Sequence, residues 1–156
     1  MTTRASVGLE HECTYWAQLK PPFEIGQGPY GARTFFEVVE GEVSGERLNG
    51  KLLTGGGDWA LIGPDGWLRL DVRVQIETSD GARLLMSYYG VLQVNEAVQQ
   101  ALGAGGGTDY GDHYIRTTPR FETGDPRYTW LTQTVFVGAG HLRPGLIVEY
   151  EVFRVT

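Results

Sequence analysis

Strict alternation of apolar and polar residues over one long segment is the feature that most constrains the fold of this chain. In Trp67–Thr78, every second residue from Leu68 to Ile76 is aliphatic, and the residues between them are polar or charged. Successive side chains of a β-strand point to opposite faces, so this pattern predicts a strand with one buried face. Such a strand is about 40 Å long, which favours a tilted sheet closing into a barrel over a sandwich of short strands.

Turn signals on both sides of this segment predict an antiparallel meander. Gly63-Pro64-Asp65-Gly66 precedes it and Ser79-Asp80-Gly81 follows it, and Asp-Gly between alternating runs is a strong hairpin signal. We therefore predict an all-β fold in which residues 1–156 form one antiparallel β-barrel domain, closed or nearly closed, of about eight to nine strands. The other predicted strands are Glu10–Leu19, Thr34–Val39, Val43–Leu53, Asp58–Ile62, Ala82–Gln93, Tyr114–Thr123, Tyr128–Val137 and Leu146–Val155.

One short helix interrupts the strand pattern. Asn95 can cap it, apolar residues between 94 and 102 share one face, and Gly103 can end it. The glycine-rich segment 103–113 that follows predicts a mobile loop, either a plain connector or a lid over the mouth of a barrel.

Composition excludes several classes of function. The net charge of −6 argues against nucleic acid or an anionic membrane as a partner, and no apolar run approaches the ~20 residues of a membrane span. Cys13 is the only cysteine, so an internal disulfide or a cysteine-based zinc site is excluded. With no apolar stretch resembling a signal peptide near the start, we expect a cytoplasmic protein.

Motifs for common cofactors and nucleophiles are missing or out of context. Gly26–Gly31 matches G-x-G-x-x-G, but a strand-like segment follows it where a dinucleotide site needs a helix. No serine has the surroundings of a nucleophile elbow, and neither lysine, Lys20 or Lys51, lies in an apolar run that would activate it for imine chemistry. The histidines lack metal-ligand spacing; they are His11, His113 and His141. We predict no cofactor and no metal.

Two groups of polar residues are candidates for chemistry. Glycines 55–57 run directly into Asp58 and Trp59, so a bend here delivers a carboxylate and an indole to one place, or is simply a barrel corner. Asp71 and Arg73 share one face of their strand, and Arg116 lies on a similar face. These faces are solvated or line the lumen. A shift of one residue in register exchanges the two alternatives.

Several motifs together resemble those of an uncharacterised bacterial and fungal family of small antiparallel barrels, known only as a domain of unknown function. They are Gly56-Gly57-Asp58-Trp59, Pro64-Asp65-Gly66, Leu70-Asp71-Val72-Arg73, Arg116–Gly124, Tyr128-Thr129-Trp130-Leu131 and Phe136-Val137-Gly138. The resemblance runs from about Leu9 to Val155. It implies a closed barrel of the calycin-like or allene-oxide-cyclase-like kind, often dimeric. Some relatives are cofactor-free cyclases, pericyclases, pyrone-forming enzymes or hydrolases of polyketide and aromatic-compound pathways.

This resemblance directs attention to Asp58, Trp59, Asp71, Arg73, Arg116, Tyr128 and Trp130. Two departures make the expected pocket less polar than the family pattern. Ser87-Tyr88-Tyr89 stands where polar or basic residues often precede Gly90, and Thr132 replaces the usual asparagine.

The residues and the resemblance together favour a cofactor-independent cyclase, isomerase or lyase acting on a hydrophobic, oxygenated ring compound; a hydrolase is less favoured. Asp58 or Asp71 is the expected general acid/base, with Arg116 or Arg73 holding a carbonyl or enolate oxygen. The expected ligand-binding residues are Trp59, Tyr88, Tyr128 and Trp130. Two alternatives remain: a barrel that carries or senses a small hydrophobic molecule, and a structural homodimer with a filled lumen.

Overall fold

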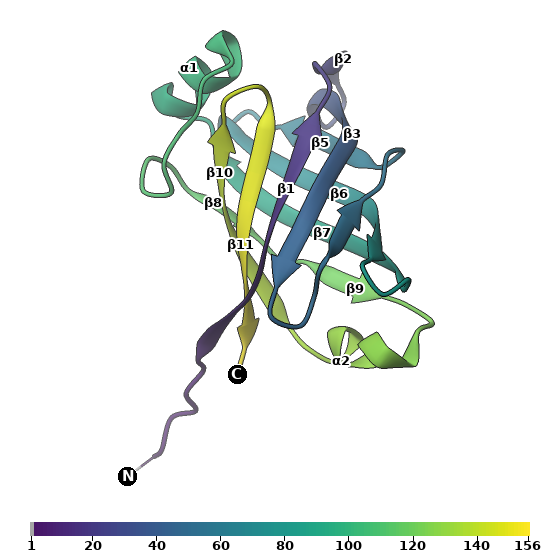
Figure 1. The fold of residues 1–156 in the computed structure, drawn as a ribbon. Coiled ribbons are helices and arrows are strands. Elements are labelled where there is room, and N and C mark those ends of the chain that lie inside the picture. Colours follow the sequence, from purple (N-terminus) through teal and green to yellow (C-terminus); the bar gives the residue numbers. More distant parts are fainter. Residues whose placement is uncertain (1) are drawn as a thin grey trace.

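The computed structural model describes residues 2–156 and contains a closed antiparallel barrel (Figure 1). Each barrel strand pairs with the next around the ring, and the last pairs with the first. In this order the eight strands are β1 (Leu9–Leu19), β3 (Gly31–Gly45), β5 (Gly57–Ile62), β6 (Trp67–Thr78), β7 (Arg83–Gln93), β8 (Ile115–Thr117), β10 (Phe136–Arg143) and β11 (Ile147–Val155). Three further strands extend the sheet: β2 (Phe23–Gly28), β4 (Gly50–Leu52) and β9 (Arg120–Glu122). The predicted all-β barrel is confirmed.

The long alternating segment forms β6, as its pattern predicts. It pairs with β7 along its whole length, from Trp67 opposite Gln93 to Glu77 opposite Arg83. Its aliphatic residues from Leu68 to Ile76 are all buried, and they form one wall of the core. Burial of one such side chain stabilises the fold by roughly 1.5–3 kcal/mol, so the alternation itself fixes which face is inside.

The glycine-rich segment before Asp58 is a bend inside what is otherwise one strand. β4 and β5 both lie between β3 and β6, and residues 53–56 join them. Gly55 has a φ of 99°, which favours glycine. A Cβ on Gly57 would lie 2.6 Å from the carbonyl oxygen of Phe36. The absence of these side chains lets the backbones approach closely and brings Asp58 to the interior.

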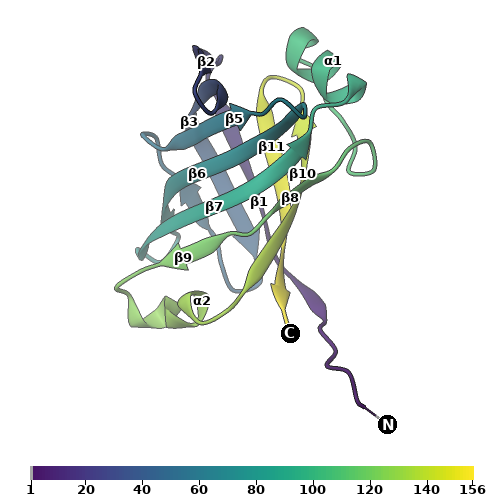
Figure 2. The same cartoon turned by 180° about the vertical axis from the view of Figure 1, so that it is seen from behind.

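Two helices mark the two ends of the barrel. Helix α1 (Glu96–Ala104) lies beside the β10–β11 hairpin, whereas α2 (Thr129–Thr132) lies at the opposite end with both chain termini (Figures 1 and 2). Asn95 caps α1 as predicted, its side chain accepting a hydrogen bond from Val98 N at 3.1 Å. The helix continues past Gly103 and is closed by Gly105, which has the left-handed conformation.

Four predicted strands are wrong in their extent. Thr34–Val39 and the start of Val43–Leu53 belong to one strand, β3, which runs on to Gly45, and a turn then precedes the short β4. Tyr114–Thr123 is broken at Thr118-Pro119, where proline cannot donate a ladder hydrogen bond. Tyr128–Val137 is mostly not a strand: a 3-10 turn, η1 (Pro126–Tyr128), and α2 occupy its first half. Asp125 starts that turn by accepting from Arg127 N at 2.9 Å, with Pro126 in the first position.

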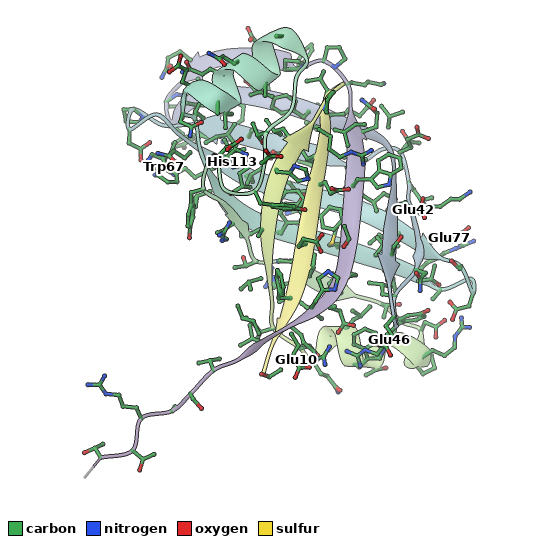
Figure 3. The ribbon with its side chains drawn as sticks, turned by 60° about the vertical axis from the view of Figure 1, so that its left-hand side comes forward. Glu10, Glu42, Glu46, Trp67, Glu77 and His113 are labelled. Carbon is green, nitrogen blue, oxygen red and sulfur yellow. The ribbon has the colours of Figure 1, made fainter. Side chains whose placement is uncertain are left out.

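Near α2, apolar side chains are buried beside an open groove that they help to line, and charged groups lie on the outside of the barrel. Phe121, Leu131 and Phe136 are buried there, and the two phenylalanine rings meet edge to face at 5.3 Å. Glu42 and Glu77 point away from the barrel (Figure 3). Among residues 2–156, no helix is long and apolar enough to cross a membrane.

Candidate functional site in the barrel lumen

Asp58 is the carboxylate that the fold places inside the barrel. It is the second residue of β5, opposite Val72 of β6, and only 8% exposed. Its Oδ1 accepts a hydrogen bond from the backbone N–H of Asp71 at 3.0 Å. That single bond leaves most of the hydrogen-bonding capacity of the carboxylate to whatever occupies the lumen.

Burial dominates the electrostatics of this carboxylate. It raises the pKa of Asp58 from 3.8 to about 7, because the charged form loses its hydration. The hydrogen bond from Asp71 N opposes the rise, the charge of Asp71 adds to it, and Arg33 lowers it slightly. Near neutral pH, Asp58 therefore exists in comparable amounts as a carboxylate and as a carboxylic acid, which suits a general acid/base.

Three tyrosines converge inside the barrel close to Asp58. Tyr15 of β1 and Tyr150 of β11 are direct cross-strand partners with stacked rings 5.1 Å apart. Tyr88 of β7 lies 5.8 Å from the Tyr150 ring and 6.3 Å from the Tyr15 ring, measured between centroids. Burial raises the pKa of each phenol well above its ordinary value, so all three stay neutral and can donate a hydrogen bond.

The hydroxyl of Tyr15 is fully buried, and no group within residues 2–156 meets it in good hydrogen-bond geometry; the nearby Tyr88 side chain only partly offsets the effect of burial, which raises the pKa of Tyr15. Leaving a buried hydroxyl unpaired costs roughly 1–3 kcal/mol. An unsatisfied group of this kind calls for an explanation. Its position in the lumen marks it as a donor available to a bound molecule.

Two neighbouring cavities share Asp58 in their lining. The inner one leaves about 30 Å³ for the centres of water-sized atoms and is lined by Asp58, the three tyrosines and aliphatic side chains. The outer one, at the α1 end, is about 50 Å³ and is lined mainly by aliphatic residues, together with Asp58, Tyr150 and Arg143. Asp58, Leu70, Val148, Leu19 and Tyr150 line both. The lumen is thus mainly apolar, and its few polar groups, Asp58 and the three tyrosines, lie around the inner cavity.

Helix α1 and the loop after it lie over this mouth. Ala101, Leu102 and Gly106 line the outer cavity. Gly145 N donates to Gly105 O at 3.0 Å, and Thr108 N donates to Leu142 O at 2.8 Å, which ties the loop to the β10–β11 hairpin. Of the two sequence hypotheses for this glycine-rich segment, a cover over the mouth agrees better with these contacts.

The residues predicted from the sequence are divided between the two faces of the barrel wall. Asp58 and Tyr88 point into the lumen. Asp71 and Arg73 lie on the outer face, where they share a shallow pocket with Arg120. Because consecutive residues of a strand face opposite sides, Trp59 is also outside, 40% exposed, with its ring 4.8 Å from that of Phe35.

The other three predicted residues lie away from the lumen. Arg116 is exposed; its guanidinium lies 5.0 Å from the Tyr114 ring and donates to Ile115 O at 2.9 Å. Tyr128 and Trp130 lie at the α2 end. The Tyr128 hydroxyl donates to Asp80 at 2.9 Å, and the Trp130 ring lies 3.8 Å under the guanidinium of Arg47.

Tyr15 and Tyr150 belong to the lumenal group but were not selected from the sequence. The alternation of each strand indicates both residues, because residues two apart share a face: Tyr15 shares one with the buried Cys13 and Ala17, and Tyr150 shares one with the buried Val152. Within residues 2–156, no group of three His, Cys, Asp or Glu side chains is placed to hold a metal ion.

Comparison with known proteins places the chain in a family. Residues 7–155 match the family model described as "Protein of unknown function (DUF3237)". A UPF0311 protein of Clostridium acetobutylicum is 37% identical over 117 residues, which cover 74% of each chain. The crystal structure of a conserved protein of unknown function from Rhodopseudomonas palustris has a TM-score of 0.90 and 30% identity, covering 98% of this chain and all of the other.

A third comparison shows the fold alone. An enzyme from Penicillium herquei has a TM-score of 0.72 over the whole of both chains at 19% identity. The family match spans nearly the entire sequence, and the barrel agrees with its solved relatives. This chain therefore belongs to the DUF3237 family of proteins of unknown function.

Proposed function

We propose that this protein is a cofactor-independent enzyme that moves a proton on a small, hydrophobic, oxygenated ring compound held in the lumen. Asp58 is its general acid/base, and the reaction is of the isomerase, cyclase or lyase type. The proposal gives no catalytic role to Asp71, Arg73 or Arg116, because their side chains lie on the outer face of the barrel.

One observation carries this proposal: Asp58 is the only acidic side chain lining either lumenal cavity, as far as the described residues go. An isolated carboxylate in an apolar lumen costs stability, because its charged form is poorly solvated. The same burial gives it a pKa of about 7, the value at which an acid/base is effective in both directions. A purely structural lumen would be filled more stably by an aliphatic side chain.

The aliphatic lining of the outer cavity supports a hydrophobic substrate. The outer cavity itself is small, about 50 Å³, and opens to solvent. A ring compound must widen the narrow inner end of this space to reach Asp58. The Penicillium herquei protein is described as an enzyme, which is consistent with catalysis on this fold. A homodimer and a cytoplasmic location remain predictions.

Hydrogen–deuterium exchange into cyclic ketones tests the proposal without knowledge of the natural product. A panel including 1-tetralone and chroman-4-one is incubated in D₂O with wild type, and exchange beside the carbonyl is followed by NMR. Exchange should exceed that in buffer and fall about 10²–10⁴-fold in Asp58→Asn. Glu42→Gln, on the outer face, is the matched control. Exchange equal to buffer, or equal in wild type and Asp58→Asn, contradicts the proposal.

A carrier of small hydrophobic molecules is the second candidate, and the mainly apolar lining favours it. In that case the same ketones bind to wild type and to Asp58→Asn with similar affinity, and no exchange occurs. The two functions are therefore separated by one set of samples, measured once for binding and once for exchange.

A further inference from the structure

We propose that Tyr15, together with Tyr88 and Tyr150, binds the carbonyl oxygen of the substrate in the inner cavity, so that the substrates are ketones that enter oxygen first. The inference rests on the proposed function and specifies the substrate class. It assigns to tyrosine hydroxyls the role that the sequence suggested for arginine.

Tyr15 carries a buried hydroxyl inside the barrel. That hydroxyl has no partner in good geometry within residues 2–156, and the Tyr15 side chain lines the inner cavity. The tyrosines come from three different strands, β1, β7 and β11, so the barrel wall holds all three rings rigidly. Preorganised donors of this kind stabilise a developing negative charge on oxygen, because they need no rearrangement during the reaction.

The shape of the lumen gives the orientation of the ligand. The inner cavity, about 30 Å³, has room for one or two oxygen-sized groups, whereas an apolar ring needs the aliphatic outer cavity, widened toward Asp58. Asp58 lines both cavities. When the oxygen lies among the tyrosines, the carbon next to the carbonyl therefore lies at the level of the carboxylate.

The proton transfer that this arrangement allows needs no co-reactant. The Asp58 carboxylate takes a proton from the carbon next to the carbonyl, the C–H electron pair forms a C=C bond, and the C=O pair moves onto oxygen. The resulting enolate oxygen accepts hydrogen bonds from the neutral tyrosines, which keep their protons. The Asp58 carboxylic acid then returns the proton to a carbon of the enolate, which leaves an isomerised or exchanged product.

Binding of 4-nitrophenol tests this site, because its phenolate is a coloured analogue of an enolate on a ring. Asp58→Asn, which imitates the protonated acid, serves as the background. Tyr15→Phe should weaken phenolate binding about tenfold or more, as expected for loss of a hydrogen bond to a charged group. Tyr89→Phe, whose ring is exposed on the outer face, should bind as the parent does. Nitrobenzene, which lacks the phenolate oxygen, should bind to the parent and to Tyr15→Phe with equal affinity.

Several outcomes overturn the inference. These are an unchanged affinity of Tyr15→Phe for the phenolate, an equal loss of nitrobenzene affinity, and the absence of saturable phenolate binding. A second measurement uses only the parent protein, which keeps all its tyrosines, so it does not depend on whether a tyrosine variant folds. The pKa of 4-nitrophenol bound to this protein should be lower than the pKa of free 4-nitrophenol. The opposite displacement contradicts donation by the tyrosines.

Failure here is distinguishable from failure of the proposed function. If Asp58→Asn abolishes ketone exchange while Tyr15→Phe leaves phenolate affinity unchanged, the proposed proton transfer is supported and the proposed tyrosine site is wrong. If binding depends on Tyr15 but no exchange occurs, the oxygen site stands and the protein is a carrier.

Discussion

Asp58 should make this protein less stable as the pH rises from about 4 to about 8, and replacing it by asparagine should remove that loss. Burial raises the pKa of its carboxyl from 3.8 to about 7 in the folded state. Between these values the folded protein keeps a proton that the unfolded chain has released. Stability from this proton is fully present below the unfolded pKa and is lost as pH rises through the folded one.

The magnitude follows from the same two values. Within this window the free energy of unfolding falls by up to about 1.4 kcal/mol per pH unit, so the whole window costs about 4 kcal/mol. Asparagine keeps the oxygen that accepts from Asp71 N and carries no charge at any of these pH values. The gap between Asp58→Asn and wild type should therefore grow by about 4 kcal/mol from pH 4 to pH 8, which corresponds to about 10 °C in melting temperature.

Urea unfolding of both proteins at each pH measures this gap directly. Glu42→Gln removes a carboxylate from the outer face of β3, where Glu42 points away from the barrel (Figure 3), and controls for the change in net charge. Parallel curves for Asp58→Asn and wild type from pH 4 to pH 8 would refute the reasoning. They would show that the lumen does not penalise the charged form of Asp58, and the acid/base proposal would lose its physical basis.

Three further predictions concern the glycine-rich bend before Asp58, the end of the barrel near α2, and the outer face of the barrel. Gly57→Ala should destabilise the fold by about 2 kcal/mol in chemical denaturation, because its Cβ would meet the Phe36 carbonyl oxygen at 2.6 Å; unchanged stability would contradict the close approach. Tyr128→Phe loses the bond to Asp80 and should cost about 1 kcal/mol while leaving 4-nitrophenol binding intact, whereas weakened binding would place Tyr128 in the site. Arg116→Ala should also leave that binding unchanged, and a loss measured by absorbance titration would return arginine to the site.

Local pattern was sufficient for the class of fold and for most of its strands. The alternation in β6 and the Asp-Gly turns on both sides depend only on residues close together in the chain, and they predict the antiparallel barrel that the structure has. The predicted strand boundaries were wrong where a weak strand signal competed with a stronger turn or helix signal. Proline at 119 breaks one predicted strand, and Asp125-Pro126 starts a helical turn in place of another.

The candidate site was only partly predictable, because it depends on which face of each strand is inside. Asp58 and Tyr88 were selected from the sequence and line the lumen, whereas Trp59, Asp71 and Arg73 follow the opposite parity and lie outside.

The sequence by itself therefore determined a barrel with a glycine-rich bend that ends in Asp58. Only the tertiary structure decided that Asp58 meets three tyrosines. Tyr15, Tyr88 and Tyr150 are far apart in the chain, and closure of the ring by the pairing of β11 with β1 brings them together. That closure also removes the carboxylate from water, and this gives Asp58 its raised pKa.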